Sequence, residues 1–147
     1  MERSSSLADL AWSIESNPSG DDVRALSDGL TEHALPVTGR PGFQPIAVFA
    51  RAAGGRVVAG AYGLTSWNWL HISLVWVSPE LRRQGTGRRL ITAIEDAARA
   101  RGCMHAHLDT FSYQARPFYE KLGYEVFGAL EDYPPGHQRF FLRKSIG

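Results

Sequence analysis

The segment from Val77 to Leu90, "VSPELRRQGTGRRL", constrains the fold of this chain more than any other stretch. A hydrophobic run that predicts a strand precedes it, and a run with helical periodicity follows, so Gly85 and Gly87 lie at a strand-to-helix turn. Glycine lets a backbone approach a bulky ligand, and the first N–H groups of a helix have no partner inside the helix. The helix dipole adds positive charge there. The segment therefore predicts a diphosphate site, flanked by Arg82, Arg83, Arg88 and Arg89.

This positive charge is local, because the 147-residue chain has a formal net charge of only +1. No global field draws it to nucleic acid or to a membrane surface. A hydrophobic content of 44% suits a single folded domain over residues 1–147. Cys103 is the only cysteine, which excludes an internal disulfide and disfavours a cysteine-built metal site. No apolar run approaches the roughly 18 residues of a membrane span, and none suits a signal peptide, so the cytoplasm is the expected compartment.

The first half of the chain predicts one helix among strands. Alternation at residues 10–14 suggests a first strand, and Ser19 with Asp22 suggests the N-cap of a helix that must end before Pro36. Two strand-like runs, 44–52 and 56–67, flank a hairpin turn at Gly54-Gly55. A third strand, 69–77, follows a break near residues 66–68. It is expected to carry its even-numbered hydrophobic residues on one face: Leu70, Ile72, Leu74 and Trp76.

The second half predicts two helices and three further strands. A buried stripe with helical spacing runs through residues 87–101, with Glu95 and Arg99 expected as an i,i+4 pair on the exposed side. Gly102 is suited to ending this helix. A strand at 104–111 and a short helix at 115–122 follow, then strands at 124–130 and 138–144. The predicted order is β, α, three antiparallel β, α, β, α, β, β.

Two motifs in this order resemble the GNAT superfamily of N-acetyltransferases. Residues 82–87, "RRQGTG", resemble its Arg/Gln-X-X-Gly-X-Gly/Ala signature and follow a typical "VSPE", whereas a dinucleotide fingerprint would need a small residue in place of Leu90. About thirty residues later, "ARPFYEKLGYEVFG" is similar to the second signature of the family. The resemblance extends over residues 57–144. It implies an α/β fold, a mixed and mostly antiparallel sheet flanked by helices, with a splayed central strand pair.

The resemblance also implies acetyl-CoA as co-substrate, with no metal. The pantetheine arm would pair with the strand before the turn, where the Val75 amide would polarise the thioester carbonyl. The diphosphate would lie on backbone amides from Gln84 to Arg88. Ser112 stands where many relatives carry an asparagine that helps to bind CoA, which leaves its role less defined. The implied cofactor-binding residues are Val75, Trp76, Val77, Arg82, Arg83, Gln84, Gly85, Thr86, Gly87, Arg88, Ser112 and Tyr119.

Acetyl transfer to an amine requires a proton donor for the departing thiolate and a neutral amine. Tyr119 matches the family's tyrosine acid, and a phenol with an ordinary pKa near ~10 stays protonated at neutral pH. Tyr113 and Tyr124 are expected to pack against the core instead. His71 and His107 are candidate bases, because histidine titrates in the right range; a chain of water molecules is an equal alternative. The alternating His105 and His107 beside Asp109 are weak evidence for a metal. Six loop residues are expected to rim the acceptor cleft: Trp67, Trp69, Glu131, Asp132, Tyr133 and His137.

The sequence therefore predicts an N-acetyltransferase that acts on a primary amine of a small molecule. A protein lysine or N-terminal acetyltransferase and a non-catalytic acyl-CoA-binding module remain alternatives. Retention of Tyr119 and of the glycine turn argues against the last of these. A homodimer formed through the C-terminal strands is a further expectation from the resemblance, and the aromatic pair in "RFFLRK" would suit a strand at the sheet edge.

Overall fold

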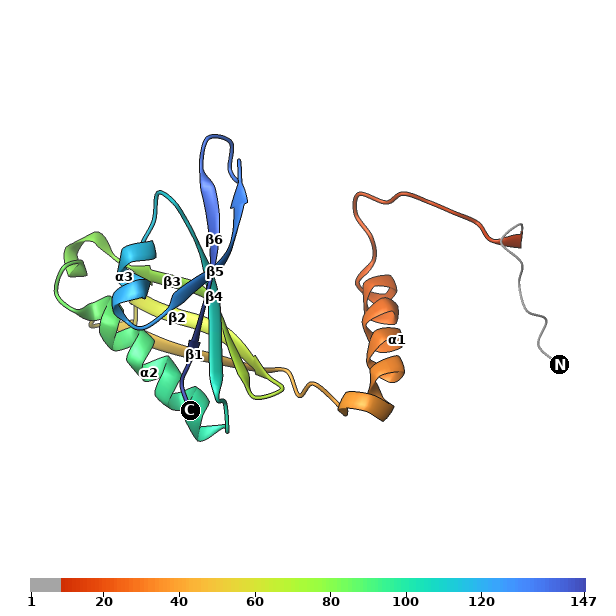
Figure 1. Ribbon diagram of the computed structural model, residues 1–147, viewed down its shortest axis with the longest axis horizontal. Coiled ribbons are helices and arrows are strands. Elements are labelled where there is room, and N and C mark those ends of the chain that lie inside the picture. The colour runs from red at the N-terminus through yellow and green to blue at the C-terminus, as the bar shows by residue number, and fades with distance from the viewer. Residues whose placement is uncertain (1–8) are drawn as a thin grey trace. The chain divides into compact units, whose positions relative to one another are not determined.

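The computed structural model describes residues 9–147, which divide into two compact units. One reaches Arg40 and the other comprises Pro41–Gly147. The first unit contains α1 and the second contains the sheet with its helices (Figure 1). One domain over residues 1–147 stays a prediction.

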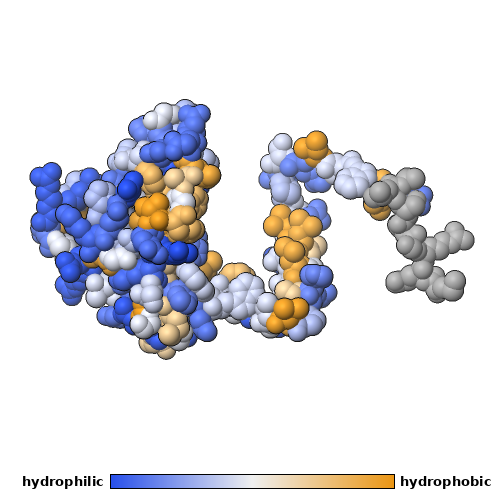
Figure 2. Space-filling view, in the orientation of Figure 1, coloured by the Kyte–Doolittle hydropathy of each residue, from blue (hydrophilic) through white to orange (hydrophobic). Residues whose placement is uncertain are grey.

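Helix α1, Gly20–Thr38, is capped as the sequence predicts, since the Ser19 hydroxyl accepts a hydrogen bond from the Asp22 N–H at 3.1 Å. The expected end before Pro36 is wrong. Pro36 removes only one backbone hydrogen bond from the last turn of the helix. The helix therefore continues to Thr38, and the Gly39 N–H then donates to the Leu35 carbonyl. Figure 2 shows an exposed apolar stripe along α1, which includes Val23, Leu26 and Leu30.

The expected strand at residues 10–14 is absent from the described structure. These residues have no regular secondary structure and no place in the sheet. Alternating hydrophobicity alone does not make a strand, because each strand needs backbone partners on a neighbour. No helix within residues 9–147 is long and apolar enough to cross a membrane.

The second unit is built on a six-stranded sheet in the order β1-β2-β3-β4-β6-β5. Its strands are β1 Gln44–Arg51, β2 Val57–Ser66, β3 Trp69–Val77, β4 His105–Phe111, β5 Glu125–Glu131 and β6 Gln138–Ser145. Only the β3–β4 pair in this sheet is parallel. The mixed, mostly antiparallel sheet expected from the sequence is therefore confirmed. The predicted hairpin turn is confirmed as well, with φ of 86° at Gly54 and 89° at Gly55.

Two helices, α2 Thr86–Ala100 and α3 Arg116–Lys121, contribute to one hydrophobic core with the sheet. A 3₁₀ turn, Pro79–Leu81, lies between β3 and α2. Gly102 and Gly123 follow the two helices with φ of 89° and 98°, which glycine adopts without strain. The buried side chains come from both helices, from strands β1, β2, β3, β4 and β6, and from the C-terminus; they include Ile46, Leu70, Ile72, Ile91, Ile94, Leu108, Tyr119, Phe140 and Leu142.

A β-bulge in β3 reverses the faces of that strand. Tyr62 pairs with Leu74 and Gly63 pairs with Ile72, so Ser73 is the extra residue. Before the bulge the even-numbered Ile72 is buried; after it Leu74 is exposed. The expected single face of Leu70, Ile72, Leu74 and Trp76 is therefore wrong, because one inserted residue inverts the alternation.

Gly63 permits the bulge. A Cβ placed on Gly63 would lie 2.1 Å from the carbonyl oxygen of His71, so no other residue fits without backbone movement. The Ser73 hydroxyl donates to the Tyr62 carbonyl at 3.3 Å, which gives the bulged residue a polar partner across the strand pair. The bulge lies where β3 and β4 begin to separate.

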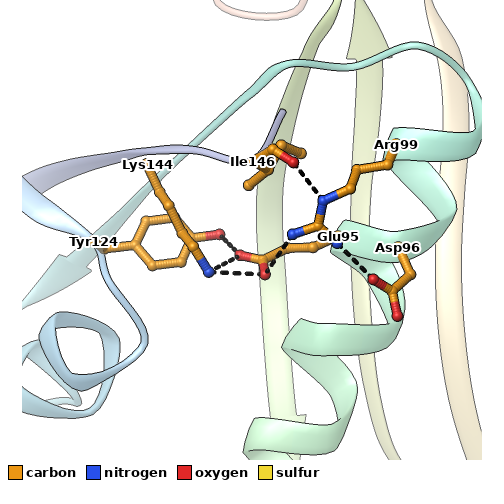
Figure 3. Close-up of polar contacts among 6 residues, drawn as sticks. All are labelled: Glu95, Asp96, Arg99, Tyr124, Lys144 and Ile146. Carbon is orange, nitrogen blue, oxygen red and sulfur yellow. Dashed lines mark hydrogen bonds and ion pairs between the residues drawn. The ribbon is translucent and has the colours of Figure 1, made fainter.

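Glu95 of α2 is buried, which corrects the expectation of an exposed pair with Arg99. Its carboxylate accepts hydrogen bonds from the Tyr124 hydroxyl at 2.7 Å and from the Lys144 ammonium at 3.0 and 3.1 Å (Figure 3). Arg99 lies 3.9 Å from the same carboxylate and also donates to the Ile146 carbonyl. These donors compensate the burial of the charge and tie α2 to the two ends of the C-terminal hairpin.

Strand β6 lies inside the sheet, paired with β4 on one side and β5 on the other. The expectation that "RFFLRK" forms a sheet edge is wrong, since both of its edges already have backbone partners. The C-terminal edge strand is β5, and it exposes Val126, Phe127 and Leu130.

Candidate active site

The parallel strands β3 and β4 separate beyond one pair of residues. They pair from Trp69 and His105 to Ile72 and Leu108, and no pairing follows although both strands continue. The splayed central pair expected from the resemblance is therefore present. A cleft of about 300 Å³ opens there, and it is lined by Ile72, Ser73, Leu74, Val75, Leu108, Asp109, Thr110, Phe111, Gln114 and Tyr119.

Tyr119 of α3 reaches this cleft from the core side. Its side chain is 8% exposed, and its hydroxyl has no hydrogen-bond partner within residues 9–147. Burial, and secondarily the charge of Asp109, raise the pKa of Tyr119 to about 12. The phenol is therefore protonated over the whole physiological range and free to donate into the cleft.

Tyr124 and Tyr113 have other environments. Tyr124 is buried, and burial together with its hydrogen bond to Glu95 raises its pKa far above the ordinary value. It packs in the core, as expected. Tyr113 does not: it is 58% exposed and stacks on Phe111, with ring centroids 5.6 Å apart.

The turn before α2 has the backbone of an anion site. The first helical hydrogen bond runs from the Arg89 N–H to the Gly85 carbonyl at 3.1 Å. The N–H groups of Thr86, Gly87 and Arg88 come before it and have no acceptor within the helix. Gly85 has a φ of 79°, and a Cβ placed there would meet nothing within 4 Å. The donors and the open space fit a diphosphate, so the residues present suit acetyl-CoA.

Two side chains of the turn fix the turn itself. The Arg82 Nε donates to the Val77 carbonyl at 3.1 Å, and the Gln84 amide donates to the Glu80 carbonyl at 2.9 Å. A Cβ on Gly87 would lie 3.1 Å from the Cζ of Phe118, so Gly87 also permits close packing of α2 against α3. Arg83 and Arg88 are exposed and make no ion pair within the described residues.

A second cavity, of about 810 Å³, lies between the start of α2 and strands β1 and β2. It shares Gln84, Gly85 and Thr86 with the turn but is not lined by Tyr119 or by the splayed part of β4. The smaller cleft brings together a proton donor and a free strand, so it is the candidate reaction site.

His71 and His107 stack on each other on the sheet. They are partners in the β3–β4 register, with ring centroids 4.5 Å apart and planes at 4°. Burial and the neighbouring His71 lower the pKa of His107, against an opposing effect of Asp109. These two effects favour the neutral form of the His107 imidazole. The two lie one residue pair before the splay, and neither lines the cleft.

Ser112 is engaged with the strand β6 rather than with the cleft. Its hydroxyl accepts from the Gln138 N–H at 3.0 Å and lies 3.4 Å from His137 Nδ1. Among the predicted loop residues, Tyr133 stacks near a cleft residue, with its ring 5.9 Å from that of Phe111. Trp69, by contrast, begins β3 at the end opposite the splay.

Asp109, Phe111 and Gln114 line the cleft, although sequence reasoning assigned them no role there. Strand alternation in "HAHLDTF" places Asp109 and Phe111 on the same face of β4, so the sequence could have predicted that these two side chains lie together. Residues 9–147 hold no group of three or more metal-ligating side chains arranged for an ion.

Comparisons with known proteins agree with this geometry. The acetyltransferase (GNAT) family profile matches residues 9–124. Blasticidin-S acetyltransferase of Streptomyces morookaense is 36% identical over 107 residues, 70% of this chain and 79% of that protein. An acetyltransferase of Agrobacterium fabrum is 31% identical over 82% of this chain and 88% of its own length. The crystal structure of a putative acetyltransferase from Agrobacterium tumefaciens superposes with a TM-score of 0.86 and 27% identity, over 92% of this chain and 99% of the other.

The glycine turn, the splayed strand pair, the buried tyrosine and these similarities lead to one conclusion: the chain belongs to the GNAT acetyltransferase family and is an acetyl-CoA-dependent acyltransferase.

Proposed function

We propose that this enzyme transfers an acetyl group from acetyl-CoA to a primary amine of a small molecule. The observation that carries the proposal is the cleft of about 300 Å³ between β3 and β4, with the Tyr119 hydroxyl unpaired at its wall. The relative named for acetylation of blasticidin S supports a small-molecule acceptor.

The backbone of the turn would bind the diphosphate. The N–H groups of Thr86, Gly87 and Arg88 would donate to it, and the side chains of Arg83 and Arg88 would add charge-assisted contacts, with the 3′-phosphate near this rim. Ser112 stays a predicted contact. Val75, Trp76 and Val77 would offer the strand backbone that β4 leaves free to the pantetheine arm.

When bound, acetyl-CoA supplies an activated acetyl thioester. The Val75 amide would polarise the thioester carbonyl, and the cleft walls would hold the two reactants in line. The amine nitrogen forms the new C–N bond while the C–S bond breaks. Tyr119 Oη would give its proton to the thiolate, and the proton lost by the amine would pass to His107, to His71 or through water to bulk solvent.

A thiol-release assay with acetyl-CoA tests this proposal. Three acceptor sets are compared, namely small amines, peptides with a free N-terminus and peptides with an internal lysine. Turnover with small amines supports the proposal, and turnover confined to peptides would favour the protein acetyltransferase. Acetyl-CoA binding by calorimetry without turnover on any acceptor would favour the non-catalytic module.

A further inference from the structure

Asp109 is the only carboxylate that lines the reaction cleft within the described residues. It is the first residue of β4 beyond the last β3–β4 pair, so it lies where the two strands begin to separate. Its charge acts on Tyr119, which shares the cleft. A cationic amine that enters the cleft therefore meets this carboxylate.

Only one of the two carboxylate oxygens of Asp109 has a hydrogen-bond partner among the described residues. Its Oδ2 accepts a hydrogen bond from Arg139 Nε at 2.8 Å, and its Oδ1 has no hydrogen-bond partner within residues 9–147. The two side chains are 22% and 26% exposed, so solvent reaches the pair. Arg139 fixes the direction of the carboxylate and leaves one oxygen free for a second donor.

Aromatic rings surround this ion pair. The Arg139 guanidinium lies 4.9 Å from the ring centroid of Tyr133, 5.3 Å from that of Phe141 and 5.5 Å from that of Phe111. The Phe111 ring is parallel within 5° to those of Tyr113 and Tyr133. The two tyrosines are 58% and 46% exposed, so both rings keep apolar surface open to solvent next to Phe111 of the cleft.

A cross-strand ion pair beside an aromatic ring also occurs elsewhere on this sheet, at a different cavity. Glu125 of β5 pairs with Arg143 of β6 at 3.1 Å, and the Arg143 guanidinium lies 5.3 Å from the Phe127 ring. Neither residue lines the reaction cleft. Each pair joins a carboxylate to an arginine across two strands, and only the Asp109 pair has its carboxylate in the cleft that Tyr119 lines.

We propose that Asp109 anchors the ammonium group of the acceptor through its free oxygen, and that this group loses one proton through water to bulk solvent before the nitrogen attacks the thioester. Tyr113 and Tyr133 pack against a flat ring of the same molecule. The acceptor class is then an arylalkyl or heteroarylalkyl primary amine. Arg139 positions Asp109, and its charge disfavours acceptors with a second cation, such as polyamines. This inference rests on the proposed acetyl transfer to a small amine.

Three probes test the acceptor class by thiol release: 2-phenylethylamine, 2-cyclohexylethylamine and spermidine. The wild-type protein is expected to prefer the phenyl compound over the cyclohexyl compound by about 3- to 10-fold in kcat/KM, because aromatic pairs add to simple burial. Spermidine is expected to be the poorest acceptor. A Tyr133→Leu variant should lose the preference for the phenyl ring. Equal kcat/KM values for all three probes would overturn the assignment of the acceptor class.

The anchor is tested by Asp109→Asn, with Glu125→Gln as the matched control. Asp109→Asn should raise the KM for 2-phenylethylamine by about 10- to 100-fold, the range for a lost charged hydrogen bond, with the KM for acetyl-CoA unchanged. Glu125→Gln should change neither constant. Asp109→Glu should restore part of the lost affinity. An unchanged amine KM in Asp109→Asn, or the same change in both carboxylate variants, would overturn the anchor.

Calorimetric binding of 2-phenylethylamine to the CoA-bound protein tests the Asp109 anchor separately from the proposed acetyl transfer. Binding that depends on Asp109 but gives no turnover in the wild-type protein supports the anchor and contradicts the acetyl transfer. Turnover that is insensitive to Asp109 contradicts the anchor and supports the acetyl transfer. Melting temperatures of the variants identify any loss of folding, and Asp109→Glu then serves as the folded comparison.

Discussion

At the scale of single residues, the environment of Tyr119 distinguishes it from the other tyrosines near the core. Tyr124 is also buried, but its hydroxyl is bonded to Glu95, whereas the Tyr119 hydroxyl is unpaired at the wall of the cleft. An acid must give up its proton to a reacting group, so a hydroxyl without a protein acceptor is better placed for that role.

Replacing Tyr119 by phenylalanine should lower turnover by roughly 10²- to 10⁴-fold if proton transfer limits the reaction. The ring and its packing remain, so acetyl-CoA affinity and the melting temperature should change little. Single-turnover kinetics, binding calorimetry and thermal unfolding of the same variant measure these three quantities. Near-normal turnover would move the proton donor to another group or to solvent.

The raised pKa of Tyr119 also predicts a pH dependence of stability. The folded protein holds this proton up to about pH 12, whereas the unfolded chain releases it near the ordinary ~10. The stabilisation is therefore complete below pH ~10 and is lost as the pH rises toward 12, by at most about 2–3 kcal/mol. Urea unfolding across this range should show a smaller loss in Tyr119→Phe. Equal losses in both proteins would contradict the prediction, because Tyr124 titrates in both.

At the scale of elements, two glycines determine how closely neighbouring elements can pack. Gly63 permits the bulge in β3, and Gly87 permits contact between α2 and Phe118 of α3. In both cases a neighbouring segment occupies the space that a Cβ would need. Substitutions at these positions should therefore disturb the relation between two elements.

Gly63→Ala should destabilise the protein by about 1–3 kcal/mol or more, because the methyl group collides with the His71 carbonyl and not with a flexible side chain. Denaturant unfolding measures this loss. Gly128→Ala is the matched control, since a Cβ there meets nothing within 4 Å on another strand of the same sheet. Similar stability of the two variants would mean that β3 does not need the glycine.

Gly87→Val should weaken CoA binding at least about tenfold if the backbone of the turn must approach the diphosphate. Contact with Phe118 offers a second cause, so Gly87→Val/Phe118→Leu is the control. CoA affinity that stays low in the double variant supports the diphosphate site at Gln84–Arg88. Recovery of affinity would assign the effect to the packing of α3, and an unchanged affinity in folded Gly87→Val would exclude the site.

At the scale of the whole sheet unit, the Glu95 network joins segments that are distant in the sequence. Glu95 belongs to α2, Tyr124 precedes β5, and Lys144 lies near the end of β6 (Figure 3). Buried charges are retained only when they are paired, so removing one donor leaves the carboxylate poorly compensated.

Lys144→Met should cost about 1–3 kcal/mol, since it removes charged hydrogen bonds and keeps the apolar stem. Glu95→Gln/Lys144→Met should recover part of this loss, because the buried charge is gone. A double-mutant cycle by denaturant unfolding measures the coupling. Additive effects of the two substitutions would show that the ion pair contributes nothing of its own.

We expect the protein to form a homodimer, with the exposed residues of the edge strand β5 as the C-terminal contact: Val126, Phe127 and Leu130. Light scattering at micromolar concentration measures the mass. A monomer mass would contradict the expectation. If the protein is a dimer, Phe127→Glu should dissociate it and leave the fold intact, because this side chain is half-exposed.

The sequence by itself determined the local elements and the two motifs, because helix periodicity, strand alternation and glycine turns depend on residues close together in the chain. The α2 helix, the hairpin at Gly54-Gly55 and the Ser19 cap were predictable in this way. Tertiary structure decided what depends on distant partners. Residues 10–14 form no strand without a backbone partner, and Glu95 is buried because Tyr124 and Lys144 reach it. The bulge at Ser73 lies where β3 and β4 separate, and the register of β4 with β6 brings Asp109 to Arg139.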